Sequence, residues 1–114
     1  MMRAITTDRF SCDILLSEKP IIALFEASWC PFCRAFKPVM QRSEDDLPWP
    51  IVAVLLDDMD DSLWDRYEIE VVPTIMVFKG GEIVFRANGT LGVGLDASDI
   101  SRLKAFVRGR GGDG

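Results

Sequence analysis

The sequence predicts a single α/β domain in which a central mixed sheet carries helices on both faces. Short apolar runs typical of buried strands alternate with segments of helical periodicity. The alternation ends in two β-prone runs joined by Gly80-Gly81, the signature of a hairpin, so the last two strands are expected to be antiparallel. At 114 residues, 48% of them hydrophobic, the chain has room for one core and no second domain.

The first half of the chain is expected to run helix, strand, helix, strand. Residues 8–17 have apolar side chains at helical spacing, and residues 21–26 form a short run typical of a buried strand. A longer helix is expected from about residue 30 to about residue 45. Residues 51–56 are continuously β-prone, which predicts a strand covered on both faces in the middle of the sheet.

The second half is expected to contain a short helix, the hairpin and a final helix. The aspartates of residues 57–61 are interpreted as the cap of a helix that runs through about Tyr67. The hairpin strands are residues 74–79 and 82–87, and the final helix is residues 98–108, capped by Asp96 or Ser98. We therefore expect a domain over residues 1–108 and a flexible glycine-rich tail over residues 109–114.

Charge and composition exclude several partners. The 13 basic and 18 acidic residues give a formal charge of −5, which argues against nucleic acid or an anionic membrane as partner. The amino terminus has no apolar run of about 7–15 residues, so a secretory signal is not expected. We expect a cytoplasmic monomer, although an exported form without its signal stays open.

Cys30 and Cys33 are the strongest functional signal. Residues three apart share a helix face, with about 5–6 Å between Cβ atoms, so two such sulfurs can cycle between dithiol and disulfide. A helix that begins near Cys30, with Pro31 at its first position, places this sulfur at the positive end of the helix dipole and favours the thiolate. Cys30 is therefore expected to be the nucleophile and Cys33 the resolving thiol.

Two other interpretations of the cysteines were weighed. Zinc needs about four ligands, and the chain has no histidine and one other cysteine, so we expect neither a metal nor any cofactor beyond the redox-active Cys30–Cys33 disulfide. The alternative is a zinc site to which two copies of the chain each supply one cysteine pair. Cys12 is expected to be a small packed side chain, with a regulatory or dimerising thiol as the alternative. Trp49 and Trp64 are expected to pack in the core.

Four segments together resemble the thioredoxin family over nearly the whole chain: Trp29-Cys30-Pro31-Phe32-Cys33, then Val72-Pro73-Thr74, then Phe78-Lys79-Gly80-Gly81-Glu82, then Gly89. The resemblance implies a thioredoxin fold and a thiol–disulfide oxidoreductase that reduces protein disulfides. It also implies a cis peptide bond before Pro73 and a substrate groove in which the backbone of Val72 pairs with an extended peptide. The residues that frame this groove would be Trp29, Pro31, Phe32, Val72, Pro73 and Gly89.

The chain departs from that family beneath the cysteines. Many thioredoxins have a buried aspartate six residues before the first cysteine and a lysine on the neighbouring strand, where this chain has Leu24 and Val54. Both replacements are apolar, which suggests repacking of one layer. Glu26 is expected to share a strand face with Leu24 and could accept the proton of Cys33. The alternative is a carboxylate that faces solvent at the strand end.

The pair Pro31-Phe32 is more similar to glutaredoxins than to thioredoxins. It favours a reduction potential between those of thioredoxin and the strongest oxidants. It also leaves glutathione as an alternative to an external reductase. A third possibility is a non-catalytic binding module or chaperone that uses the groove alone.

Overall fold

The computed structural model describes residues 2–109 and contains five strands and three α-helices in that range. The strands are β1 (Arg3–Thr6), β2 (Ile21–Glu26), β3 (Ile51–Leu55), β4 (Thr74–Lys79) and β5 (Glu82–Ala87). The helices are α1 (Pro31–Arg42), α2 (Ser62–Arg66) and α3 (Ala97–Gly109). Shorter turns of helix occupy Thr7–Arg9, Ser11–Leu15 and Glu44–Asp46.

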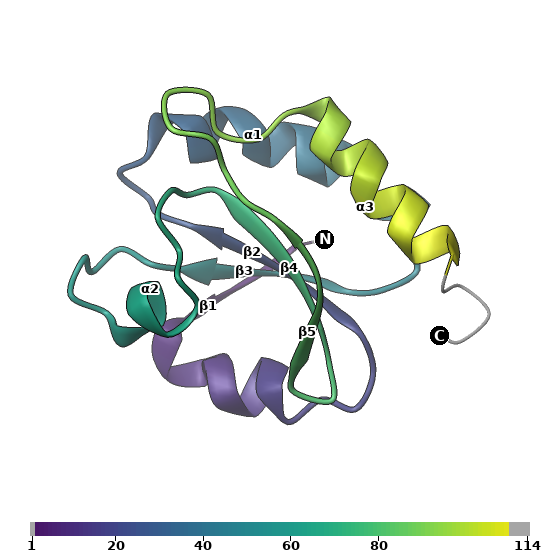
Figure 1. The fold of residues 1–114 in the computed structure, drawn as a ribbon, viewed down its shortest axis with the longest axis horizontal. Coiled ribbons are helices and arrows are strands. Elements are labelled where there is room, and N and C mark those ends of the chain that lie inside the picture. The colour runs from purple at the N-terminus through teal and green to yellow at the C-terminus, as the bar shows by residue number, and fades with distance from the viewer. Residues whose placement is uncertain (1, 110–114) are drawn as a thin grey trace.

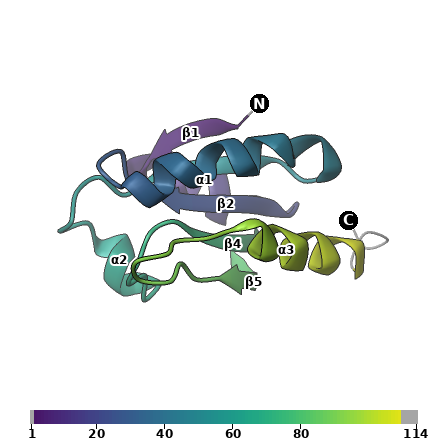
Figure 2. The same ribbon diagram turned by 90° about the horizontal axis from the view of Figure 1, so that it is seen from above.

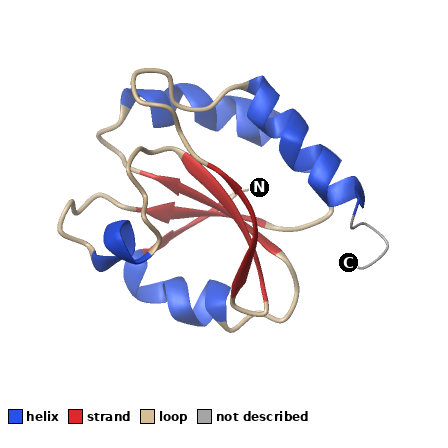
Figure 3. Ribbon diagram, viewed as in Figure 1, coloured by secondary structure: helices blue, strands red, loops and turns tan. Residues whose placement is uncertain are grey.

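The strands form one mixed sheet in the order β1-β3-β2-β4-β5. β1, β3 and β2 are parallel, whereas β4 pairs antiparallel with both β2 and β5. The predicted hairpin is present with the predicted bounds, and its turn places Gly80 and Gly81 at positive φ, which glycine adopts without strain. Figure 3 shows the sheet between two layers of helix, so the predicted α/β class is confirmed.

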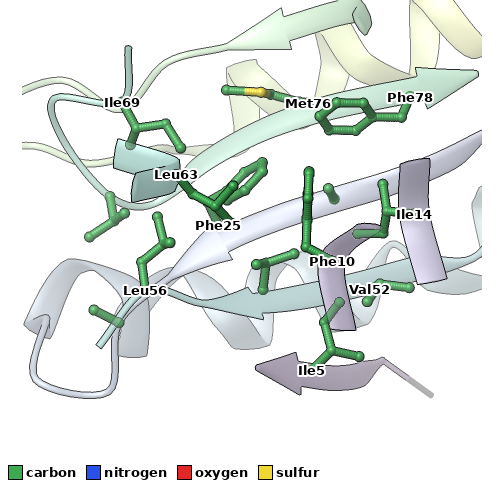
Figure 4. Close-up of a cluster of buried hydrophobic side chains, with 14 of the residues drawn as sticks. Ile5, Phe10, Ile14, Phe25, Val52, Leu56, Leu63, Ile69, Met76 and Phe78 are labelled. Atoms are coloured by element: carbon green, nitrogen blue, oxygen red, sulfur yellow. The ribbon is translucent and has the colours of Figure 1, made fainter. Parts of the chain in front are cut away.

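Each face of the sheet has its own hydrophobic cluster. α1 and α3 cover one face (Figures 1 and 2). The cluster on this face includes Phe36 and Leu103 from the helices and Ile22 and Ile75 from the sheet. The helical turns of residues 7–15 and α2 cover the other face, where Phe10 and Ile14 meet Phe25 and Phe78 (Figure 4). All six residues of β2 are buried, as expected of the central strand of a sheet that is covered on both sides.

The structure corrects several local predictions at the amino terminus. Strand β1 was not predicted, because its four residues bury only Ile5 and are too few to show a period. Residues 7–15 form a 3₁₀ turn and then a π-helical turn instead of a regular helix. Cys12 is exposed on that turn, so the prediction of a packed side chain is wrong. Of the predicted tail, Gly109 ends α3, and the remainder lies outside the described residues.

The packing of Leu24 and Val54, which stand where many thioredoxins have an aspartate and a lysine, also differs from prediction. Leu24 packs with the cluster under α1 and α3, whereas Val54 packs with the cluster under α2. Their strands pair so that Leu24 stands opposite Ala53 and Phe25 stands opposite Val54. Since successive strand residues point to opposite faces, Leu24 and Val54 lie on opposite faces of the sheet. The two apolar replacements therefore change the packing of two layers and not of one.

Candidate active site

The two cysteines lie where β2 passes into α1, at the carboxyl end of the central strand. Cys30 is the N-cap of α1 with extended backbone (φ −94°, ψ 116°), and Pro31 is the first helical residue. Cys33 is therefore the third residue of the helix. Both are free thiols, and both are buried, with exposed fractions of 4% and 3%. The predicted start of the helix at Cys30 is confirmed.

Hydrogen bonds fix the sulfur of Cys30 at the helix end. The backbone N–H of Cys33 donates to Cys30 Sγ over 3.3 Å. The sulfur thus takes the role that a side-chain oxygen has at the N-cap of many helices. This bond strengthens when the sulfur carries negative charge, and the helix dipole acts in the same direction. In the thiol form, Cys30 Sγ donates to the carbonyl of Val72 over 3.5 Å. Cys30 is thus oriented between the helix and the chain segment before β4.

The surroundings of Cys33 disfavour its thiolate. Burial raises the pKa of Cys33 to about 12. The hydrogen bond with Cys30 and nearby negative charge, including that of Glu26, raise this pKa further. Cys33 therefore holds its proton at neutral pH. A reaction in which its sulfur attacks requires a group that takes this proton.

Glu26 ends β2 and is buried, so the expectation of a solvent-facing carboxylate is wrong. Glu26 as a whole is 5% exposed, and Lys37 Nζ lies 3.3 Å from Glu26 Oε1. Lys37 comes from α1, four residues after Cys33 and so on the same side of that helix. Lys37 was not predicted, although its spacing from Cys33 in the sequence places it on the same side of the helix. The helix that carries the resolving thiol thus also carries the partner of the buried acid.

The segment Val72-Pro73 borders the cysteines, as the resemblance implied. Its peptide bond is cis, and both residues are buried. Gly89 follows β5 and passes so close to this segment that a Cβ atom there would lie 2.3 Å from the carbonyl oxygen of Pro73. Thr74 ties the two segments together, because its Oγ1 donates to the Val71 carbonyl and accepts from the Gly89 N–H. Only glycine can occupy position 89 without a shift of the backbone.

Trp29 is held at the rim of the site by a residue that sequence reasoning did not identify. Asp57 accepts from the N–H and the hydroxyl of Ser28 over 2.7 and 2.9 Å, and its carbonyl accepts from Trp29 Nε1 over 2.9 Å. Parallel pairing of Glu26 with Leu55 brings the residues after β2 beside those after β3. This pairing exists only in the folded sheet, so no local pattern of the sequence indicated the role of Asp57. Asp61, by contrast, caps α2 by accepting from Leu63 N–H, as predicted for this cluster.

A mainly apolar groove of about 260 Å³ opens beside Cys30. Trp29 and Phe32 line it and are 47% and 38% exposed, and Pro31 and Val72 complete this part of the wall. Gly89 lies behind the wall and does not line the groove. The far rim was not predicted and consists of Met59, Trp64, Glu70, Val71, Leu91 and Gly92. Trp64 packs partly against the core but also faces this groove, whereas Trp49 is buried as predicted.

Across residues 2–109, histidine, cysteine, aspartate and glutamate side chains form no group of three that could hold a metal ion. In the same range, no helix has the length and apolar character needed to cross a membrane.

Comparison with known proteins gives consistent matches. The thioredoxin family matches residues 1–98. Thioredoxin C-2 of Corynebacterium nephridii is 30% identical, over 90% of this chain and 89% of its own length. Thioredoxin of Chlorobaculum thiosulfatiphilum is 33% identical, over 83% and 89% respectively. A bifunctional thioredoxin reductase/thioredoxin of Mycobacterium leprae is 29% identical, over 85% of this chain and 21% of that protein.

Proposed function

Because the chain belongs to the thioredoxin family and is a thiol–disulfide oxidoreductase, we propose that Cys30 and Cys33 are the dithiol with which it reduces protein disulfides. The observation that carries this proposal is the position of Cys30, whose sulfur caps α1 beside the Val72 carbonyl, one helical turn from Cys33. No cofactor is needed, since the Cys30–Cys33 pair itself stores the two electrons.

The reaction proceeds in two exchanges. The thiolate of Cys30 attacks one sulfur of the substrate disulfide, a bond forms between them, and the other substrate sulfur leaves as a thiolate that takes up a proton. Cys33 then loses its proton and attacks Cys30 Sγ. This step forms the Cys30–Cys33 disulfide and releases the second substrate thiol. The substrate gains two electrons and two protons, and the protein becomes the disulfide.

Glu26 is the proposed acceptor of the Cys33 proton. It is buried at the end of β2, and its charge contributes to the raised pKa of Cys33, which requires the two groups to be near each other. Lys37 holds the carboxylate in place. Glu26→Gln should slow release of the mixed disulfide in single-turnover experiments. Unchanged rates would remove Glu26 from the mechanism.

The substrate is proposed to bind as an extended segment against the Val72 backbone, beside the cis Pro73. Trp29, Pro31 and Phe32 supply the apolar contact surface on one side, and the approach of Gly89 to Pro73 fixes the position of the segment. An extended peptide can follow the open groove, whereas a folded surface can insert only a protruding loop.

The Cys30–Cys33 disulfide must be reduced again by an external partner. We propose thioredoxin reductase, because one relative carries reductase and thioredoxin in a single protein. Glutathione is the second candidate and is favoured by the Pro31-Phe32 pair. Activity with a small disulfide and glutathione, set against activity with a reductase and NADPH, separates the two. The proposed setting is the cytoplasm, with the protein acting as a monomer.

Trapping tests the assignment of the two cysteines. In a Cys12→Ser background, Cys33→Ser should accumulate a disulfide between Cys30 and a model substrate such as insulin, visible as a covalent adduct on a non-reducing gel. Cys30→Ser is the matched control and should form none. An adduct through Cys33, or binding that is indifferent to both substitutions, would contradict the proposal, and the latter result would identify a binding module.

A further inference from the structure

A second and larger hollow continues from the groove beside Cys30. Its volume is about 850 Å³, and it extends from α2 to the segment that follows β5. Trp64, Glu70, Val71 and Leu91 line both hollows, so the two form one cleft with Cys30 at one end. Its lining residues come from α2, from the chain between α2 and β4, and from β5 and the chain that follows it.

Three carboxylates line this cleft, and they belong to a stretch of the chain that is rich in acidic residues. Residues 57–70 include seven acidic residues and one basic residue, a formal charge of −6, whereas the whole chain has −5. The basic residue, Arg66, faces a separate hollow beside the amino-terminal turns. Asp65, Glu68 and Glu70 line the large hollow and are exposed. Three of the seven acidic residues therefore line the hollow that continues to the groove beside Cys30.

These carboxylates have no counter-ion in the structure. Within residues 2–109, no ion pair or side-chain hydrogen bond engages the carboxylates of Asp65, Glu68 or Glu70. Arg86 is the one cation on the cleft wall, but its guanidinium donates to the Asn88 side chain and to the backbone carbonyl of Glu68. With three carboxylates and one guanidinium, the cleft wall keeps a formal charge of −2.

The groove end of the cleft is mainly apolar. Leu91 is 84% exposed and Met59 is 70% exposed, and both line the groove together with Trp29 and Trp64. Apolar contact at one end and unpaired carboxylates along the wall suit a flexible segment that carries both kinds of side chain.

We propose that this cleft binds the stretch of substrate polypeptide that adjoins the target disulfide, and that it selects stretches rich in lysine or arginine. The proposal rests on the function proposed above and specifies its substrate class. Exposed carboxylates attract a cationic segment over about a Debye length and suppress the approach of an anionic one. The preference therefore appears in kcat/KM and weakens as salt is added.

Two model substrates test the proposal. Each is a symmetric disulfide of a short peptide whose cysteine is flanked by lysines in one and by glutamates in the other. Rates with dithiothreitol are measured in parallel, because the flanking charges also alter the intrinsic reactivity of the disulfide. The cleft variant is Asp65→Asn/Glu68→Gln/Glu70→Gln. The matched control is Glu18→Gln/Asp45→Asn/Glu82→Gln, which removes the same charge from exposed positions outside the cleft.

The wild-type protein should reduce the lysine peptide with a kcat/KM about tenfold above that for the glutamate peptide, after correction for dithiothreitol. Each exposed pair changes an equilibrium by a factor of about 1.5 to 5, and three carboxylates act together. The ratio should fall to about two in the cleft variant and be retained in the control. Equal kcat/KM values for the two peptides in the wild-type protein, or an equal loss of the ratio in the cleft variant and the control, would overturn the proposal. Failure to reduce either peptide would instead overturn the proposed function.

Discussion

The ion pair between Glu26 and Lys37 predicts an unequal response to removal of its two members. Glu26 is almost fully buried, with 7% of its side chain exposed, whereas 41% of the Lys37 side chain is exposed. If Glu26→Gln removes the carboxylate, the ammonium of Lys37 can turn into water. If Lys37→Met removes the ammonium, the carboxylate stays buried and has no other side-chain partner in the described part of the chain.

The expected magnitudes follow from these exposures. Breaking a fully buried pair costs about 3–5 kcal/mol, and the exposure of Lys37 reduces this to about 2 kcal/mol for Lys37→Met. Glu26→Gln should cost less than about 1 kcal/mol, as for an exposed pair. The double variant should be more stable than Lys37→Met alone, because it no longer buries an unpaired charge.

Urea unfolding of the reduced protein, followed by tryptophan fluorescence, measures these free energies of unfolding. A finding that Lys37→Met costs no more than Glu26→Gln would refute the reasoning. Additivity of the two single substitutions would do so as well, because it would mean that the two side chains do not interact.

Three further predictions concern Gly89, Cys33 and the redox pair. Gly89→Ala should lower the free energy of unfolding by about 2 kcal/mol and lower activity, because its Cβ would lie 2.3 Å from the Pro73 oxygen. Gly109→Ala, where a Cβ would enter open space, is the control, and equal thermal stabilities of the two variants would contradict this prediction. Burial that raises the pKa of Cys33 to about 12 means that the native state holds a proton that the unfolded state releases. Stability of the reduced protein should therefore be intact below about pH 9 and fall towards pH 12, by at most about 1.4 kcal/mol per pH unit, and Cys33→Ala should lack this component. Equilibration with glutathione should give a potential between about −200 and −260 mV, and a more negative value would argue against the influence assigned to Phe32.

The fold was predictable where the sequence has long uniform runs. The bounds of β2, β4 and β5 agree with prediction because each run is continuously β-prone and ends at a proline, a glycine or a polar residue. β1 was not predicted because it is short and joins the sheet only by pairing with β3, a contact that no local pattern indicates.

The site was predictable to the extent that it is local. The position of Cys30 at the start of α1 follows from spacing and from Pro31, both of which act within one turn of helix. The contact of Asp57 with Ser28 and the pairing of Glu26 with Lys37 depend on how strands and helices meet in space. The cleft wall is of the same kind, since it combines residues of α2 with residues of β5 and of the chain that follows it.

Selective alkylation at pH 7 tests the central claim most directly. The Cys12→Ser protein, treated with limiting iodoacetamide and mapped by mass spectrometry, should carry label on Cys30 while Cys33 stays unmodified. After oxidation, neither cysteine should react, and the mass should fall by two hydrogens as the Cys30–Cys33 bond forms. Labelling of Cys33 before Cys30, or an oxidised protein in which Cys30 still reacts, would contradict the account.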